Sequence, residues 1–357
     1  MPVATERSAA RRVREPGTPP RSLVALASFA LAAGTGTALW LLPSGVDERP
    51  GPPGHSPASG VAAPPPTASP VPRPVTSPAP RRVSRPSGFV TFVDAGRDPL
   101  FELPRAAGRD RVRWFTLGHL TAGTDGCTPG WDGHGQRRGD PVADRLGRLR
   151  AAGGEAGLAF GGPSGRELAA ACADTGRLTE AYRRAVRSFG AGHIDFEIRG
   201  PVDEATVLRR ADAIATLQRE AAAEGRPLTV SFTLPAGRTG LTRDDQTMLR
   251  ATRRRGAEIS AVNLLVPIRG ASVGGSRLRP IASAVQAAHP QITRSLGTAT
   301  GWRGIALSPV LAGAGDLSSA DARRLVAFTT RNRMAWLSTR GASPSSGVTR
   351  VLAGAAR

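Results

Sequence analysis

Residues 193–200 read H-I-D-F-E-I-R-G, a short apolar segment with charged residues at alternate positions. Successive side chains of a β-strand point to opposite faces, so Asp195, Glu197 and Arg199 share one face and the apolar residues between them share the other. This pattern is a carboxylate ladder suited to chemistry, with a guanidinium in the place of a third acid. It predicts a strand that ends in a functional site, active or altered.

The segments on either side of this stretch are also short and apolar, and they alternate with helical segments. Eight strands alternating with helices over residues 88–357 predict an α/β fold of the (β/α)8 TIM-barrel type. A doubly wound sheet is the alternative, but V-D-A-G-R-D-P after the first strand is no glycine-rich phosphate loop. The predicted strands are Phe89–Asp94, Arg113–Leu120, Gly157–Phe160, His193–Ile198, Leu228–Leu234, Ala261–Val266, Gly304–Val310 and Met334–Leu337, and the clearest helices are Ala205–Glu224, Asp244–Arg255 and Ser319–Asn332.

In such a barrel the reactive groups lie at the carboxyl ends of the strands. Besides the segment 195–199, this rule selects His119 at the end of the second strand, the segment 267–269 (Pro-Ile-Arg) and the segment 338–340 (Ser-Thr-Arg). His119 is predicted either to pack in the barrel interior or to contact a ligand. The candidate ligand-binding residues are Asp195, Glu197, Arg199, Arg269, Arg340 and His119.

The first 87 residues divide into three parts. Residues 1–22 are polar and arginine-rich, and Leu23–Leu42 is a stretch of twenty residues without a charge. That length crosses a hydrocarbon layer of about 30 Å as a helix. The preceding arginines place the N-terminus in the cytoplasm and residues 88–357 outside. An uncleaved single-pass anchor is favoured, and a cleaved signal, which would make the protein secreted, is the alternative.

Residues 43–87 are rich in proline, alanine and serine and lack apolar periodicity, so they predict a disordered linker. A polyproline chain extends by ~3.1 Å per residue, so this linker could reach up to about 130 Å. A membrane anchor, an extended linker and a barrel suggest a domain that reaches through a cell wall.

The net charge of +20 first suggests a nucleic-acid or other polyanionic partner. However, the sequence contains no lysine, so all 48 basic residues are arginine, which is typical of a GC-rich genome. We therefore expect no nucleic-acid partner. The absence of lysine also excludes Schiff-base chemistry and a phosphate-loop lysine.

The chain has two cysteines, Cys127 and Cys172, and five histidines. In an oxidising compartment such a pair forms a disulfide more readily than a metal site. The chain-entropy model gives a stabilisation of about 4 kcal/mol for closing a loop of that length. No histidines have the spacing of metal ligands, so neither a metal site nor a cofactor is predicted.

Seven segments in order resemble the secreted actinobacterial chitinases of glycoside hydrolase family 18. Among them are F-T-L-G-H-L-T-A with G-C-T-P-G-W-D-G, L-R-A-A-G-G-E-A-G-L-A-F-G-G, E-L-A-A-A-C with the second cysteine, and S-F-T-L-P-A-G-R-T-G-L-T. V-N-L-L-V-P-I-R-G and M-A-W-L-S-T-R follow, and H-I-D-F-E-I-R-G corresponds to the family's fourth strand, usually I-D-F-D-I-E-G. The resemblance covers nearly all of residues 89–342 and implies a TIM barrel.

The resemblance implies hydrolysis of β-1,4-linked N-acetylglucosamine assisted by the substrate's own acetamido group. In that family the last Glu of the hallmark protonates the glycosidic oxygen, and Arg199 stands at its position here. Glu197 stands for the Asp that orients the acetamido group, and Asp195 matches the first hallmark Asp. Arg269 replaces a tyrosine that binds the acetamido group, and Arg340 replaces the tryptophan beneath the sugar.

A guanidinium stays protonated and cannot act as a carboxylic acid does. The sequence therefore predicts an extracytoplasmic, monomeric pseudoenzyme that binds a glycan, or an anionic envelope polymer through Arg199, Arg269 and Arg340. The alternative is an active glycosidase with altered catalytic residues. A third interpretation is that coding bias filled a vacated pocket with arginine.

Overall fold

The computed structural model describes residues 85–98, 101–131, 134–135, 141–268, 276–297 and 299–354. The predicted anchor at Leu23–Leu42, most of the predicted linker and Arg269 lie outside them. No helix within the described ranges is long and apolar enough to cross a membrane.

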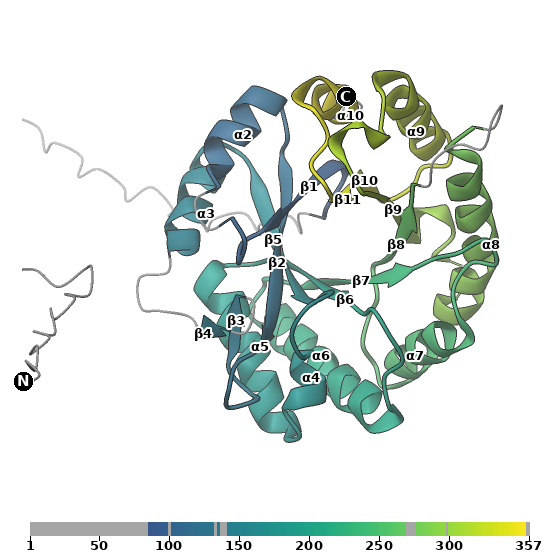
Figure 1. Cartoon of the computed structure of the whole chain (residues 1–357). Helices are drawn as coiled ribbons and strands as arrows, with labels where there is room; N and C mark the ends of the chain where they lie inside the picture. Colours follow the sequence, from purple (N-terminus) through teal and green to yellow (C-terminus); the bar gives the residue numbers. More distant parts are fainter. Residues whose placement is uncertain are drawn as a thin grey trace, which may run out of the picture. The chain divides into compact units, whose positions relative to one another are not determined.

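Eight of the described strands pair in parallel and close into a ring, seen from one end in Figure 1. β1 pairs with β2 on one side and with β10 on the other, which closes the barrel. The fold is the predicted (β/α)8 barrel. Its strands are β1 (Gly88–Asp94), β2 (Trp114–Ala122), β5 (Glu155–Gly161), β6 (His193–Glu197), β7 (Thr229–Pro235), β8 (Ala261–Pro267), β9 (Ile305–Leu311) and β10 (Trp336–Ser338).

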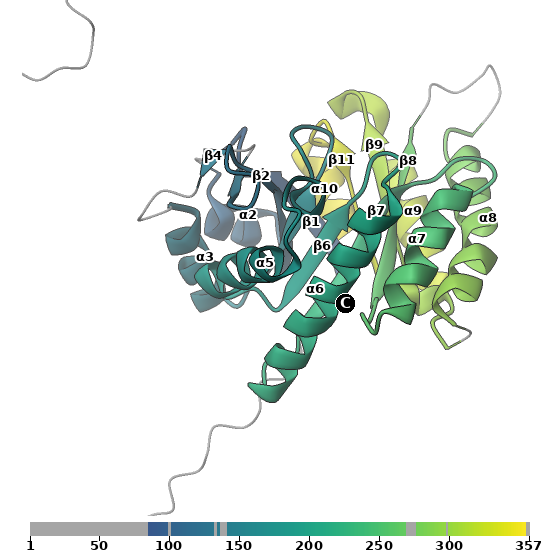
Figure 2. The ribbon, with the colours of Figure 1, turned by 90° about the horizontal axis from the view of Figure 1, so that it is seen from below.

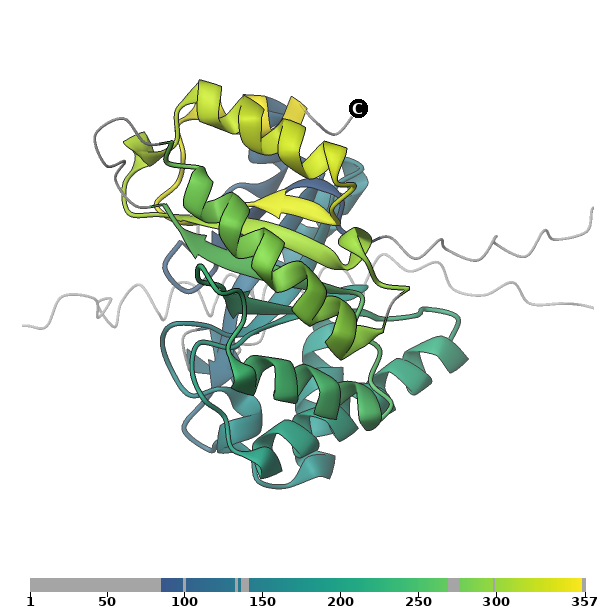
Figure 3. The same ribbon diagram turned by 90° about the vertical axis from the view of Figure 1, so that its right-hand side faces the viewer.

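Helices run back between successive strands and lie outside the ring, as Figures 2 and 3 show from two sides. The eight parallel strands therefore begin at one edge of the barrel, called the base below, and end at the other, called the mouth. The helices are α2 (Leu103–Asp110), α3 (Pro141–Ala151), α4 (Leu168–Ala171), α5 (Thr175–Phe189), α6 (Glu204–Ala223), α7 (Arg243–Arg254), α8 (Arg279–Leu296), α9 (Ser319–Arg331) and α10 (Ser346–Ala353).

Three short strands lie at the mouth end. β3 (Pro129–Trp131) runs antiparallel to β2 and pairs with β4 (His134–Gly135), and β11 (Arg340–Gly341) extends the sheet beside β9. Trp131 of β3 packs against Phe189 of α5, with ring centroids 5.4 Å apart.

The alternation of the strands separates two buried regions. Side chains such as Ile194 and Phe196 of β6 join the large apolar core between the strands and the helices. A second, small apolar cluster fills the barrel interior at the base. Its members lie at or near the first residues of the barrel strands. It consists of Val90, Trp114, Ala261, Ala306 and Trp336. Polar side chains fill the interior between this cluster and the mouth.

Candidate functional site

The mouth of the barrel is organised around one buried carboxylate, Glu197, the last residue of β6. Its side chain has no solvent exposure. Arg199 donates from Nε to Oε1 over 2.7 Å, and His119 Nε2 lies 3.1 Å from Oε2. Arg340 also approaches Oε2, with its Nε at 3.4 Å. Two guanidinium groups and an imidazole thus surround a single acid.

His119 reaches Glu197 because β2 departs from regular alternation. Its pairing with β5 shifts register between Leu117 and Leu120. Gly118 faces the interior, where an added Cβ would lie 2.7 Å from the Phe92 ring. The next residue, His119, faces the interior as well, with its ring centroid 4.9 Å from that of Phe92. In a regular strand, successive residues face opposite sides, so either Gly118 or His119 would face the helices outside the barrel.

Arg340 lies within the barrel at 5% exposure. Its guanidinium carbon sits 4.0 Å from the centroid of the Phe92 ring, and Nη1 donates to Ser338 Oγ at 3.0 Å and to the Thr339 carbonyl at 3.3 Å. Burial lowers the pKa of Arg340, while the charges of Glu197 and Asp195 act to raise it. The group stays charged at neutral pH, since an arginine begins above 12.

Glu197 is ionised at neutral pH. Burial acts to raise its pKa, but the hydrogen bond with His119 and the charges of Arg340 and Arg199 outweigh burial and lower the pKa to about 2. Since an ionised carboxylate only accepts hydrogen bonds, His119 Nε2 is the donor. Glu197 therefore has no proton to give to a leaving group.

Asp195 lies one layer deeper and belongs to a different set of contacts. Ser231 donates to its Oδ1, and Thr233 donates to Oδ2 at 2.6 Å. Asn263 donates to Thr233 Oγ1 at 3.0 Å, and Ser308 donates to Asn263 Oδ1 at 3.0 Å. Burial raises the pKa of Asp195 to about 6 despite the hydrogen bonds from Ser231 and Thr233.

His193 lies beneath Asp195 and continues the same network. Its Nδ1 is 2.9 Å from Thr229 Oγ1, and its Nε2 is 3.1 Å from Ser231 Oγ. Ser231 has one proton and gives it to Asp195, so His193 Nε2 is the donor to Ser231. The Thr229 hydroxyl also lies 3.1 Å from the Gly192 carbonyl oxygen, to which it donates. Burial lowers the pKa of His193 to about 3, so the ring is neutral at physiological pH.

The structure brings Glu197, Arg199, Arg340 and His119 together, whereas Asp195 makes its hydrogen bonds with Ser231 and Thr233, and Arg269 lies outside the described residues. Sequence reasoning missed the hydroxyl and amide side chains that hold Asp195. The sequence pattern could have predicted the three hydroxyl groups of β7, because Thr229, Ser231 and Thr233 occupy alternate positions and so share the interior face.

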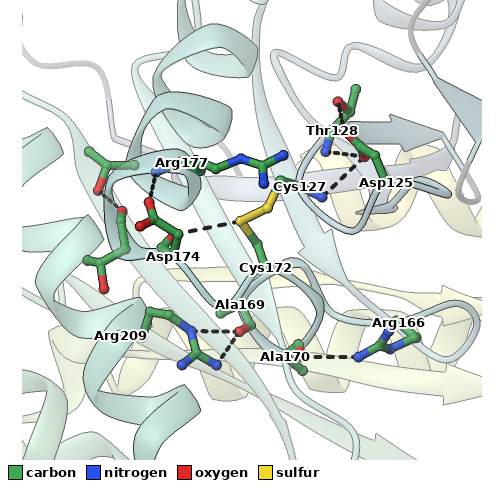
Figure 4. Close-up of a disulfide and its surroundings, with 12 residues drawn as sticks. Asp125, Cys127, Thr128, Arg166, Ala169, Ala170, Cys172, Asp174, Arg177 and Arg209 are labelled. Atoms are coloured by element: carbon green, nitrogen blue, oxygen red, sulfur yellow. Dashed lines mark hydrogen bonds between the residues drawn. A yellow bond between two sulfur atoms is a disulfide. The ribbon is translucent and has the colours of Figure 1, made fainter.

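A disulfide fastens the loops beside this mouth (Figure 4). Cys127, in the β2–β3 connection, is bonded to Cys172 at the end of α4, with the two Cα atoms 4.7 Å apart. The predicted disulfide is confirmed. Asp125 orders the same turn by accepting from the backbone nitrogens of Cys127 and Thr128.

No family model matches the chain. In sequence it is 28% identical over 180 residues to a probable bifunctional chitinase/lysozyme of Escherichia coli. This match covers 50% of this chain and 20% of that protein. It is 27% identical over 179 residues to endochitinase 11 of Metarhizium anisopliae, covering 50% of this chain and 34% of that protein. The matches thus span about a fifth and a third of those proteins' lengths.

Solved structures share the barrel. The catalytic domain of a hyperthermophilic chitinase from Pyrococcus furiosus superposes with a TM-score of 0.64 at 20% identity, over 76% of this chain and 96% of that one. A family GH18 chitinase from Cycas revoluta, solved with (GlcNAc)3, gives a TM-score of 0.55 at 11% identity, over 76% and 98%. Two chitinase relatives in sequence and the barrel shared with solved chitinases support the assignment of the chain to glycoside hydrolase family 18.

Proposed function

We propose that the barrel is a non-hydrolytic binding domain for a glycan that carries anionic groups, such as an acidic envelope polymer. One observation carries the proposal: Arg199 stands at the position of the family's proton donor and is ion-paired with Glu197 over 2.7 Å. With arginine at this position, the mouth lacks the family's carboxylic acid. The charge of Arg199 also helps to keep the neighbouring Glu197 carboxylate ionised.

Glu197 does not replace the missing acid. General acid catalysis needs a group that holds a proton near the working pH, and the pKa of Glu197 is about 2. Loss of general acid catalysis costs roughly 10²- to 10⁴-fold in rate. Hydrolysis by the mechanism of the family therefore lacks its donor.

Arg199 supplies the recognition chemistry. Its side chain is 34% exposed, and within the described part of the chain only Nε has a polar partner. The two terminal nitrogens remain for a ligand and match the bidentate geometry of a carboxylate or phosphate. Arg340 is buried and bound to Glu197, so it acts on such a ligand through charge. The contribution of Arg269 stays a prediction.

An active glycosidase is the second candidate, because one acid has a suitable pKa. Asp195 has a pKa of about 6, near the range of a general acid. Against this role, it is 3% exposed and both of its oxygens accept hydrogen bonds from Ser231 and Thr233. Reaching a glycosidic oxygen would require it to leave this network.

The domain's setting is part of the proposal. The uncharged stretch Leu23–Leu42 would anchor the chain in the cell membrane, and the proline-rich residues 43–87 would link this anchor to a monomeric barrel outside the cytoplasm. Cleavage after the apolar stretch would instead release it as a secreted protein.

The test combines hydrolysis and binding with the full-length chain. Incubation with chito-oligosaccharides should release no product above the buffer control. Calorimetric titration with a phosphate-bearing glycan should show binding that Arg199→Ala weakens by about tenfold or more, as expected for a charge-assisted bidentate contact. Combination with Arg269→Ala tests the second arginine.

Arg238→Ala is the matched control, since Arg238 is exposed in the loop after β7 and should leave affinity unchanged. Hydrolysis by the unmodified chain, abolished by Asp195→Asn, would establish the glycosidase instead. Unaltered glycan affinity in Arg199→Ala would contradict the proposed anion site.

A further inference from the structure

The base of the barrel carries a second charged surface, far from the mouth along the strand direction. Helices end at this edge, and so do the segments that lead into the strands. This edge carries exposed arginines that form no ion pair with any described residue. This base cluster consists of Arg111, Arg113, Arg148, Arg253, Arg254, Arg294, Arg303, Arg331 and Arg333.

Acidic groups at the base do not neutralise the cluster. Asp110 is paired with Arg109, Glu155 with Arg150, and Glu224 with two further arginines. Glu258, in the connection between α7 and β8, is a single exposed acid that forms no ion pair with a described residue, against nine arginines. The opposite edge is different, because the first turns of helices there carry acids. Those acids are Asp144, Glu204, Asp244, Asp245 and Asp321. Positive charge is thus concentrated at one end of the barrel.

Helix dipoles account for only part of this asymmetry. The end of a helix carries about half a negative charge, which a single arginine in the last turn offsets. At α7, three consecutive arginines occupy positions 253–255, and only Arg255 has a carboxylate partner, Asp212. Arg113 and Arg333 lie in connecting segments outside the helices, and Arg303 lies in the short 3-10 helix η1 (Trp302–Gly304). Dipole compensation leaves these charges unexplained.

The chain also enters the barrel at the base, since β1 begins there. The uncharged stretch 23–42 is therefore joined to the arginine-rich end of the domain and not to the mouth. Trp302, partly exposed beside Arg303, stacks on His289 with ring centroids 4.1 Å apart. Tryptophan is enriched at membrane–water interfaces, where its ring lies at the level of the lipid headgroups.

We propose that the base cluster docks the barrel on an anionic phospholipid surface, which leaves the mouth facing away from the membrane and open to polymeric ligands. Each arginine near such a surface adds attraction that falls off within a Debye length of ~8 Å at physiological salt. The inference does not depend on the ligand proposed for the mouth, because none of its residues lies there.

The experiment uses the full-length chain with vesicles of phosphatidylcholine alone or with phosphatidylglycerol, both containing a lipid-linked acceptor dye. A donor dye is attached at the base through Ala222→Cys or at the mouth through Thr239→Cys, both exposed positions. Energy transfer should be high only for the base label on anionic vesicles, and raised salt should abolish it.

Removal of four base charges should reduce the transfer from the base label on anionic vesicles to the level seen on phosphatidylcholine alone. The base variant is Arg253→Gln/Arg254→Gln/Arg303→Gln/Arg331→Gln. Its charge-matched control at the mouth end is Arg238→Gln/Arg243→Gln/Arg277→Gln/Arg279→Gln, which should behave as the unmodified chain.

Two outcomes would overturn the proposal. Equal transfer from the base and mouth labels, or equal transfer on both kinds of vesicle, would show that the barrel does not orient on the anionic surface. Binding of a DNA duplex at physiological salt, lost in the base variant while vesicles are not bound, would make the base a nucleic-acid surface instead.

Discussion

Glu197 and Arg340 form a buried ion pair whose partners depend on each other. Glu197 has a fully buried side chain and Arg340 is 5% exposed, so either charge alone would be costly in this interior. The contact between the guanidinium and the Phe92 ring adds a favourable cation–π interaction. The ion pair between Glu197 of β6 and Arg340 is therefore also a determinant of stability.

Glu197→Gln should destabilise the protein by about 3 to 5 kcal/mol, because it removes the carboxylate that is ion-paired with the buried charge of Arg340. The free energy of unfolding, from urea titration at pH 7, measures the change. Glu224→Gln is the control: its ion pairs lie at the surface, so its cost should be about 0 to 1 kcal/mol.

The double variant Glu197→Gln/Arg340→Met separates the two effects. It removes both charges and lets an apolar side chain pack on Phe92, so it should recover most of the lost stability. An equal or larger loss in the double variant would mean that packing, and not the unpaired charge, explains the first result.

His193 and Asp195 give stability opposite dependences on pH. The pKa of His193 falls from 6.5 to about 3 on folding, so its contribution is present above pH 6.5 and is lost as the pH falls. The pKa of Asp195 rises from 3.8 to about 6, so its contribution is present at low pH and is lost as the pH rises through 6. Between about pH 6.5 and 4.5 each amounts to roughly 2 to 3 kcal/mol, and they largely cancel.

Single substitutions should expose each contribution. As the pH falls from about 6.5 to about 4.5, His193→Gln should gain stability relative to the unmodified protein, and Asp195→Asn should lose it, each by roughly 2 to 3 kcal/mol. Urea unfolding at several pH values gives the slopes. Parallel slopes for the two variants would contradict the assigned pKa shifts.

At the scale of elements, two contacts fix the segment between β5 and α5. The disulfide joins Cys172 to the loop after β2, and the fully buried Arg210 of α6 donates to Glu167 at 3.0 Å. Gly162, in the same segment, approaches the His119 ring so closely that an added Cβ would lie 2.4 Å from it. The segment thus supports the histidine that contacts Glu197.

Replacing both cysteines, Cys127→Ser/Cys172→Ser, should lower the free energy of unfolding by about 3 to 4 kcal/mol. The disulfide closes a loop with a sequence separation of 45 residues, and opening it frees the unfolded chain. Urea titration with and without a reductant measures the effect. The reductant should destabilise the unmodified protein and leave the double variant unchanged; any response of the variant would point to another cause.

Strand and helix positions follow closely from the sequence pattern, because each element buries an apolar face with its own period. His193–Ile198 was predicted as a strand and β6 spans His193–Glu197, while Ala205–Glu224 was predicted as a helix and α6 spans Glu204–Ala223. The irregularity of β2 was not predicted, since it depends on how Phe92 of the neighbouring strand packs beside Gly118.

For the whole molecule, the net charge of +20 should make stability depend on salt. Like charges at the base repel each other in the folded state and are farther apart after unfolding. Raising the ionic strength from about 0.01 M to about 0.15 M shortens the Debye length from ~30 Å to ~8 Å and should raise the melting temperature. Arg253→Gln/Arg254→Gln should show a smaller increase; an equal one would argue against repulsion at the base.

The barrel, the order of its strands and the placement of Asp195, Glu197 and Arg199 on one face follow from the local periodicity of the sequence, and the disulfide follows from the presence of only two cysteines. The tertiary structure brings Arg199, Arg340 and His119 together at Glu197 and places Asp195 with Ser231 and Thr233. These contacts join residues far apart in sequence, and burial then sets their charge states. Periodicity specifies the face on which a side chain lies, whereas barrel closure specifies its neighbours.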